Sequence, residues 1–112
     1  MRMWMVPPEK MCRQHLLGEH VELHMFVGAI NKGKRLNHFA ENNYLDSRKI
    51  KSRHSAIVKE MKRRGYNHQS PLEYQDKLKI GKVDAEKSYK DLLARCPECR
   101  RIAMREKKNE SI

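Results

Sequence analysis

Apolar residues recur at helical spacing in three stretches of the chain. In residues 11–30 the apolar positions lie three, four or seven residues apart, at Leu16, Leu23, Val27 and Ile30. Residues 46–64 repeat the pattern with Ile50, Ile57, Val58 and Met61. Residues 83–95 offer Ala85, Tyr89, Leu92 and Leu93, and Cys96 follows them. These faces predict an all-α fold in which three helices pack compactly around one small core.

Capping residues and helix breakers set the expected ends of these helices. Asp46 or Ser47 suits the N-cap of the second helix, and Gly65 suits its C′ position. Asp84 is a suitable N-cap for the third helix, which Pro97 is expected to end. Residues 100–112 could extend as a short charged helix, but we expect a frayed tail there.

The remaining segments are predicted to be irregular. Residues 1–8 are apolar and contain two consecutive prolines, which favours an extended arm laid across the body of the protein. A glycine-centred turn follows the first helix, and residues 66–82 are typical of a connection with little regular structure. We expect a single α-helical domain over residues 1–104 and a charged, disordered tail over residues 105–112.

The charge of the chain points to an anionic partner. The 112 residues include 25 Lys and Arg against 14 Asp and Glu, which gives a formal net charge of +11. Cations that neutralise DNA phosphates release condensed counterions, so this charge favours binding to nucleic acid. The alternative is a solvated basic surface that keeps a small protein soluble.

Neither a membrane anchor nor an export signal is expected. The longest apolar run, residues 25–30, is too short to cross a bilayer, and the first ten residues lack the apolar core of a signal peptide. We therefore expect a cytoplasmic monomer with no membrane partner. Three cysteines in such a chain favour reduced thiols or a metal site over disulfides.

Several motifs occur in an order and spacing that resembles a known family. They are Gln14-His15-Leu16, Glu19, Glu22, Val27-Gly28-Ala29, Gly33-Lys34-Arg35, Phe39 and the basic run of residues 62–67. Together they resemble the phage endonuclease V type of pyrimidine-dimer DNA glycosylase. The resemblance implies an enzyme that excises cyclobutane pyrimidine dimers from duplex DNA and cleaves the resulting abasic site, with no cofactor needed for catalysis.

The resemblance also assigns the chemistry to Met1 and Glu22. In this family the α-amine of the mature N-terminus forms an imine with C1′ of the sugar, and one glutamate of the first helix is the essential carboxylate. The pKa of an ordinary α-amine is about 8, against about 10.4 for a lysine, so a chain end supplies more neutral amine. Arg2 is bulky and should protect Met1 from removal, and the mechanism also requires that Met1 is not formylated.

Cations and polar residues near these motifs are the predicted DNA contacts. They are Arg2, Arg13, Gln14, His15, Lys32, Lys34, Arg35, Lys62, Arg63, Arg64 and Lys87. The alternative for residues 62–64 is a favourable interaction with the dipole of their own helix. Two arginines that the family carries around its glutamate are Val21 and Met25 here, so other cations must hold the lesion.

Two short motifs predict a metal site that joins the two ends of the chain. Cys12 and His15 form a C-x2-H pair in the first helix, and Cys96 and Cys99 form a C-x2-C pair after the third. Together they supply four ligands for a structural zinc ion, which would stabilise so small a core. The alternative for His15 is a place in the active site. The other histidines are too scattered to be predicted as ligands: His20, His24, His38, His54 and His68.

Two functions of different class fit these observations. The first is a repair glycosylase with abasic-site lyase activity. The second is a non-catalytic, zinc-stabilised nucleic-acid-binding module, which the charge and the cysteines support equally well. A middle case cleaves abasic sites but does not excise dimers. Glu22→Gln separates the two main functions, because a binding module tolerates it whereas the enzyme loses its chemistry and keeps its DNA affinity.

Overall fold

The protein, seen in a computed structural model that describes residues 1–68 and 70–110, is built from helices and connections. Its α-helices are α1 (Arg13–Asn31), α2 (Asn37–Glu41), α3 (Ile50–Arg63), α4 (Ala85–Arg95) and α5 (Pro97–Glu110). Two 3-10 turns, η1 (Pro8–Lys10) and η2 (Ser47–Lys49), precede α1 and α3. The described residues contain no strand, which confirms the all-α prediction. Among them no helix combines the length and the apolar character that crossing a bilayer requires.

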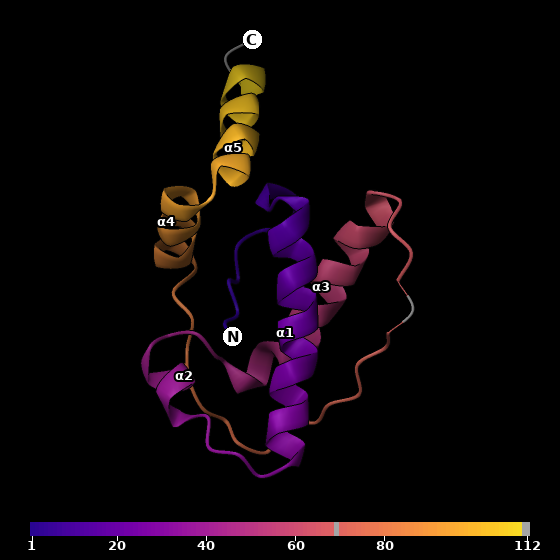
Figure 1. Cartoon of the computed structure of the whole chain (residues 1–112), viewed down its shortest axis with the longest axis vertical. Helices are drawn as coiled ribbons and strands as arrows, with labels where there is room; N and C mark the ends of the chain where they lie inside the picture. Colours follow the sequence, from indigo (N-terminus) through magenta and orange to yellow (C-terminus); the bar gives the residue numbers. More distant parts are fainter. Residues whose placement is uncertain (69, 111–112) are drawn as a thin grey trace.

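Helix α1 lies in the middle of the fold, with α3 beside it (Figure 1). It lies against α3, while η1 contacts both α3 and α5, and α4 contacts α5. The side chains that α1 buries in the core are Leu16, Leu23, Phe26 and Val27. The N-terminus lies beside the middle of α1 in Figure 1, and the C-terminal end of α5 lies far from it. The three predicted helices are confirmed as α1, α3 and α4.

The predicted capping residues occupy the expected positions. Asp46 accepts a hydrogen bond from the backbone N–H of Arg48 at 3.1 Å, and so caps η2 at the start of the second helical segment. Gly65 follows α3 with a φ of +82°, the left-handed conformation that a glycine adopts without strain. Asp84 accepts from the backbone N–H of Lys87 at 3.1 Å and caps α4.

The structure corrects the sequence prediction at two helices. Pro97 ends α4 as expected, but the chain does not fray there, because the proline begins α5 at a position where its missing N–H is not needed. Cys99 is fully buried and Ile102 packs against the core, which anchors α5. Residue 104, where we placed the end of the domain, lies within α5, and this domain boundary stays a prediction. Residues 111–112 of the expected tail lie outside the described residues. Helix α2 lies in a segment expected to be a loop.

The N-terminal arm is fixed in the core, as its apolar sequence predicts. Met3 and Val6 are fully buried, and Trp4 is 6% exposed. The backbone N–H of Met3 donates to the carbonyl of Tyr44 at 2.7 Å. The arm therefore places Met1 beside the middle of α1 rather than in solvent.

A buried ion pair joins α1 to α3. Both carboxylate oxygens of Glu19 accept from the Arg53 guanidinium, at 2.6 Å from Nε and 2.8 Å from Nη2. Neither residue is more than 5% exposed. Removing one partner of such a pair costs about 3–5 kcal/mol, because the other charge stays buried. Glu19 is therefore explained by packing between helices rather than by the chemistry of the pocket.

The connection between α3 and α4 has no regular structure in its described residues, as predicted, but hydrogen bonds tie it to η2. Ile80 and Ser47 exchange two hydrogen bonds, from Ser47 N to Ile80 O at 3.0 Å and from Ile80 N to Ser47 Oγ at 2.9 Å. Gly81 has a φ of +83°, and a Cβ there would lie 1.9 Å from the carbonyl oxygen of Leu45. Only glycine fits this close approach.

Candidate active site and metal-ligand clusters

A pocket of about 470 Å³ lies between the N-terminal arm, α1 and the end of α4. Successive turns of α1 line one side of the pocket, because residues three or four apart share a helical face. The residues that line the pocket are Met1, Arg2, Trp4, Gln14, His15, Gly18, Glu19, Glu22, Tyr44 and Arg95. We refer to it as the Met1 pocket. It unites both predicted catalytic residues with three of the predicted DNA contacts.

Glu22 lies directly beside the chain end. Its Oε2 accepts a hydrogen bond from the backbone N–H of Arg2, with an N···O distance of 3.4 Å. Since Arg2 follows Met1, this contact brings the Glu22 carboxylate next to the residue that carries the α-amine. Both Met1 and Glu22 are only partly buried, so a ligand in the pocket can reach them.

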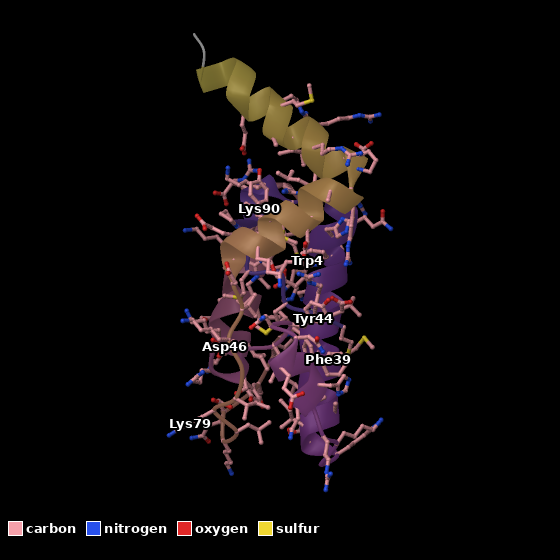
Figure 2. The ribbon with its side chains drawn as sticks, turned by 90° about the vertical axis from the view of Figure 1, so that its left-hand side faces the viewer. Trp4, Phe39, Tyr44, Asp46, Lys79 and Lys90 are labelled. Carbon is pink, nitrogen blue, oxygen red and sulfur yellow. The ribbon has the colours of Figure 1, made fainter. Side chains whose placement is uncertain are left out.

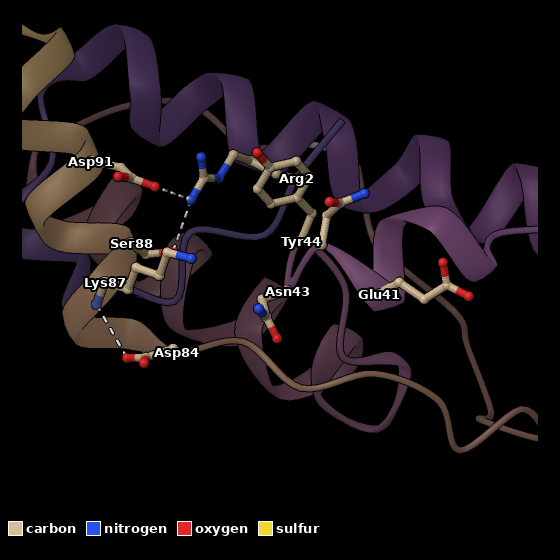
Figure 3. A pocket seen from close by; sticks show the side chains of 9 residues that line it. Arg2, Glu41, Asn43, Tyr44, Asp84, Lys87, Ser88 and Asp91 are labelled. Carbon is tan, nitrogen blue, oxygen red and sulfur yellow. Dashed lines mark hydrogen bonds and ion pairs between the residues drawn. The ribbon is translucent and has the colours of Figure 1, made fainter.

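Arg2 is buried at the side of the pocket. Its guanidinium contacts the rings of Trp4 and Tyr44, at 3.8 and 4.4 Å from their centroids, and these rings lie near one another in Figure 2. Nη2 donates to Ser88 at 3.2 Å and pairs with Asp91 at 3.5 Å (Figure 3). Burial lowers the pKa of Arg2, although Tyr44 and Asp91 act to raise it. Arg2 therefore ties the arm to α4, and its contact with a phosphate stays a prediction.

A second, smaller pocket adjoins the Met1 pocket at Arg2 and Tyr44. It has a volume of about 260 Å³, and Lys87 lies at its edge (Figure 3). Glu41, Asp84 and Asp91 also line it, so carboxylates outnumber the cations there. The acidic lining makes this pocket a poor phosphate site, and DNA contact by Lys87 stays a prediction.

The basic turn after α1 lies on the other side of Met1. Lys32, Lys34 and Arg35 are exposed, and they line a hollow of about 480 Å³ together with Met1 and Met25. Cations therefore border the chain end on this side. Their position fits the predicted contact with DNA phosphates beside the Met1 pocket.

The basic end of α3 is partly occupied by structural contacts. Glu60 accepts from Arg63 at 2.7 Å and from Arg64 at 2.6 Å, and the hydrogen bond from Arg63 is the main cause of the lowered pKa of Glu60. Arg64 also donates to the carbonyls of Pro8 at 3.1 Å and Met11 at 2.7 Å. Arg64 thus fixes η1 against α3. DNA contacts by this run, including exposed Lys62, stay predictions, and none of the three lines the Met1 pocket.

The remaining predicted contacts lie near the start of α1. Arg13 and Gln14 are exposed, and the guanidinium of Arg13 lies 4.8 Å from the ring centroid of Tyr66. Val21 and Met25 stand where the family that the chain resembles has arginines. They are 55% and 50% exposed on the outer side of α1. No cation therefore occupies those two positions on this helix.

Arg95 is a site residue that sequence reasoning missed. It is exposed in the last turn of α4 and lines the Met1 pocket, which also contains Glu22. The only sequence signal was its basic character, because the position of the third helix relative to the first could not be derived from spacing. Arg95 brings a cation to the pocket where Val21 and Met25 bring none.

The predicted metal ligands meet in space. The ligand atoms of Cys12, His15, Cys96 and Cys99 all lie within 4.8 Å of one another, and the three cysteines are buried. Cys12 Sγ lies 3.8 Å from Cys96 Sγ and 3.2 Å from His15 Nδ1. Burial raises the pKa of the Cys99 thiol to about 12. This cluster of three cysteines and one histidine, the cysteine cluster below, can hold a metal ion between the starts of α1 and α5.

The prediction that the other histidines are too scattered is wrong for four of them. His20 and His24 of α1, His54 of α3 and His68 after α3 form ring contacts with centroid distances of 4.8 to 5.4 Å. The pKa of His20 is lowered to about 4, chiefly by burial and in addition by the neighbouring His54, His24 and His68. We call this group the histidine cluster. Tertiary packing of α3 on α1 assembles it, which spacing along the sequence could not reveal.

Comparison with known proteins bears on the part of the chain that forms most of the Met1 pocket. A family model described as pyrimidine dimer DNA glycosylase matches residues 1–74 of the 112-residue chain. The matched part contains the arm, α1, α2 and α3, whereas α4 and α5 lie beyond it. No curated protein matches the chain, and no solved structure matches it. The chain belongs to the pyrimidine dimer DNA glycosylase family.

Proposed function

We propose that this protein excises cyclobutane pyrimidine dimers from duplex DNA and then cleaves the abasic site, with Met1 as nucleophile and Glu22 as the essential carboxylate. The observation that carries the proposal is the contact of Glu22 with the backbone N–H of Arg2, which sets a carboxylate beside the chain end. The family match covers both residues. We expect the enzyme to act as a monomer in the cytoplasm.

In the proposed reaction the α-amine of Met1 attacks C1′ of the damaged nucleotide. The lone pair of the amine forms the N–C1′ bond, and the bond from C1′ to the pyrimidine nitrogen breaks with its electrons leaving on the base. The amine then loses a proton, and opening of the sugar ring gives an imine. Loss of a C2′ proton expels the 3′ phosphate by β-elimination, and water hydrolyses the imine to free the amine.

Glu22 contributes charge and proton transfer to this sequence. Its carboxylate stabilises the positive charge that develops on the sugar as the base departs, and it accepts and returns protons during the imine steps. The partial burial of the Met1 pocket supports this role, because a fixed charge acts more strongly where water is excluded.

Recognition of the damage needs no base-specific contact in this proposal. Arg95 on one side of Met1 and Lys32, Lys34 and Arg35 on the other are placed to bind the phosphates that flank the lesion. A dimer weakens stacking and pairing, so the duplex bends and a nucleotide leaves the stack at lower cost there. The net charge of +11 supplies the general attraction to DNA.

We also propose that the cysteine cluster holds one structural zinc ion. Three sulfurs and one imidazole form a donor set that zinc prefers, and Zn–S bonds of about 2.3 Å place tetrahedral sulfurs about 3.8 Å apart. The distance between Cys12 Sγ and Cys96 Sγ has this value, 3.8 Å. When bound, zinc would supply a cross-link between α1 and α5. It would also fix His15, which lines the Met1 pocket.

Loss of this zinc should destabilise the protein. We expect Cys99→Ser, or chelation by EDTA, to lower the melting temperature. Free zinc at about one hundred times its Kd should stabilise the native protein by about 2.7 kcal/mol. The measurement is a thermal melt with and without chelator, together with cobalt substitution, which should give a thiolate-to-cobalt charge-transfer band. Ala94→Ser, which adds a hydroxyl on the exposed side of α4, is the control. It should change neither the melting temperature nor the cobalt charge-transfer band. A chain that melts identically with and without EDTA and shows no such band contradicts a structural zinc.

A panel of three duplexes tests the proposed activity. Duplexes that carry one cyclobutane dimer, one abasic site or no damage are incubated with the protein, and strand cleavage is followed on a denaturing gel. We expect cleavage of the first two and not of the third. Cleavage of the abasic duplex alone identifies a lyase without dimer excision. Binding to all three without cleavage supports the alternative, a non-catalytic nucleic-acid-binding module.

A further inference from the structure

The histidine cluster combines residues from three separate parts of the chain. His20 Nε2 lies 2.9 Å from His68 Nε2, and the ligand nitrogens of His20, His54 and His68 all lie within 4.8 Å of one another. His24, one turn after His20 on α1, contacts the rings of both His20 and His54 at centroid distances of 4.9 and 5.1 Å. Three imidazole nitrogens therefore converge between α1, α3 and the connection that follows α3, and the ring of His24 packs beside two of these histidines.

Two ring nitrogens of this cluster lack a hydrogen-bond partner among the described residues. His20 is 8% exposed and His54 is 6% exposed. Among the described residues, the Nε2 atoms of His24 and His54 are buried with no partner. A buried polar atom that makes no hydrogen bond destabilises the native state, so such atoms are rare unless something else binds them. Two of them in one cluster indicate a site that can accept a ligand.

His54 offers a ring nitrogen that is available to a ligand. A backbone hydrogen bond with Ser70 acts to raise the pKa of His54, which burial lowers overall. Among the described residues, Nε2 of His54 has no hydrogen-bond partner. In metal-binding histidines one ring nitrogen binds the ion, and the second is generally hydrogen-bonded to a carbonyl or carboxylate.

We propose that His20, His54 and His68 bind one divalent transition-metal ion, with His24 as the fourth ligand. Imidazole nitrogens favour zinc, nickel, cobalt and copper over magnesium and calcium, which prefer oxygen. The site shares no residue with the cysteine cluster, so the chain holds two ions when both sites are filled.

The ion has a structural role at this position. It ties His68, in a segment without regular secondary structure, to the packed pair of α1 and α3. His20 and Glu22 are two residues apart on α1, which places them on nearly opposite faces of the helix. The ion therefore holds the side of α1 that faces away from the Met1 pocket and takes no part in the reaction at C1′.

Metal content and cadmium spectroscopy of the whole protein test this proposal. Cadmium-113 NMR of the wild-type protein is expected to show one resonance in the range of nitrogen-only ligands, apart from any thiolate-ligated resonance of the cysteine cluster. His68→Ala should remove the nitrogen-type resonance and lower the bound metal by one ion per chain. His38→Ala is the matched control, because His38 is an exposed histidine of α2 outside the cluster.

His68 is chosen for the first variant because it is only partly buried, whereas His54 is almost fully buried and its loss could misfold the protein. A second variant, at His24, tests the same site independently. His24→Ala should weaken the affinity for the ion about tenfold or more while the thiolate-type resonance persists. The proposal is overturned if the wild-type protein shows no nitrogen-type resonance at saturating cadmium. It is equally overturned if His68→Ala and His38→Ala bind the same number of ions, which would leave a metal-free cluster of packed histidines.

Discussion

Replacing Glu22 with glutamine is expected to slow dimer excision by roughly a hundredfold to ten-thousandfold, the range for loss of a positioned acid–base group. The neutral amide keeps the shape of the side chain beside Arg2 but removes the charge that stabilises a developing cation at C1′. DNA affinity should persist or rise slightly, because one negative charge leaves a basic surface. Single-turnover cleavage and a binding titration measure the two quantities separately.

Glu73→Gln is the matched control for this change. Glu73 is exposed in the connection between α3 and α4 and does not line the Met1 pocket. Glu73→Gln removes the same charge as Glu22→Gln, but it does so outside the Met1 pocket. This variant should therefore cleave at the wild-type rate. Wild-type cleavage by Glu22→Gln, or equal losses in both variants, would show that Glu22 has no specific part in the chemistry.

Blocking the α-amine of Met1 is expected to abolish both base excision and abasic-site cleavage. An N-terminal ubiquitin fusion turns the amine into an amide, which has no lone pair available for attack on C1′. The fusion should bind DNA and cleave none of it. Removal of ubiquitin by a deubiquitinase exposes Met1 again and should restore full activity in the same sample, which makes each preparation its own control. A fusion that cleaves dimer DNA before deubiquitination contradicts the amine mechanism.

The helices that sequence patterns located are those with a continuous apolar face and clear ends. Ile50, Ile57 and Met61 of α3 are buried, and Gly65 follows the helix as expected. Helix α5 was missed because its sequence is largely charged, and it is held instead by fully buried Cys99 near its start. A single buried side chain of this kind gives little periodic signal.

The candidate site was predictable where it lies on one helix and its preceding arm. Spacing along α1 and the resemblance paired Met1 with Glu22, and both line the Met1 pocket, where Glu22 accepts a hydrogen bond from the backbone N–H of Arg2. Arg95 and the histidine cluster were not predictable, because both depend on how separate helices pack. The ion pair of Glu19 and Arg53 likewise joins residues 34 positions apart that no local pattern connects.

The Met1 pocket and the cysteine cluster share one residue. His15 lines the pocket, and its Nδ1 lies 3.2 Å from Cys12 Sγ. Its ring also meets Trp4 edge to face, with centroids 5.6 Å apart. The two alternatives for His15 in the sequence, metal ligand and pocket residue, are therefore compatible. A metal at the cysteine cluster would orient a ring that borders the proposed reaction site.

Borohydride trapping with a duplex that carries one cyclobutane dimer tests the central proposal most directly. Borohydride reduces an imine between enzyme and sugar to a stable amine, and mass mapping of the digested adduct identifies the residue that attacked C1′. We predict a reduced adduct on the peptide that begins with Met1, and on its α-amine. An adduct on a lysine, or no adduct with dimer or abasic duplex although Met1 is intact and DNA is bound, would contradict the account.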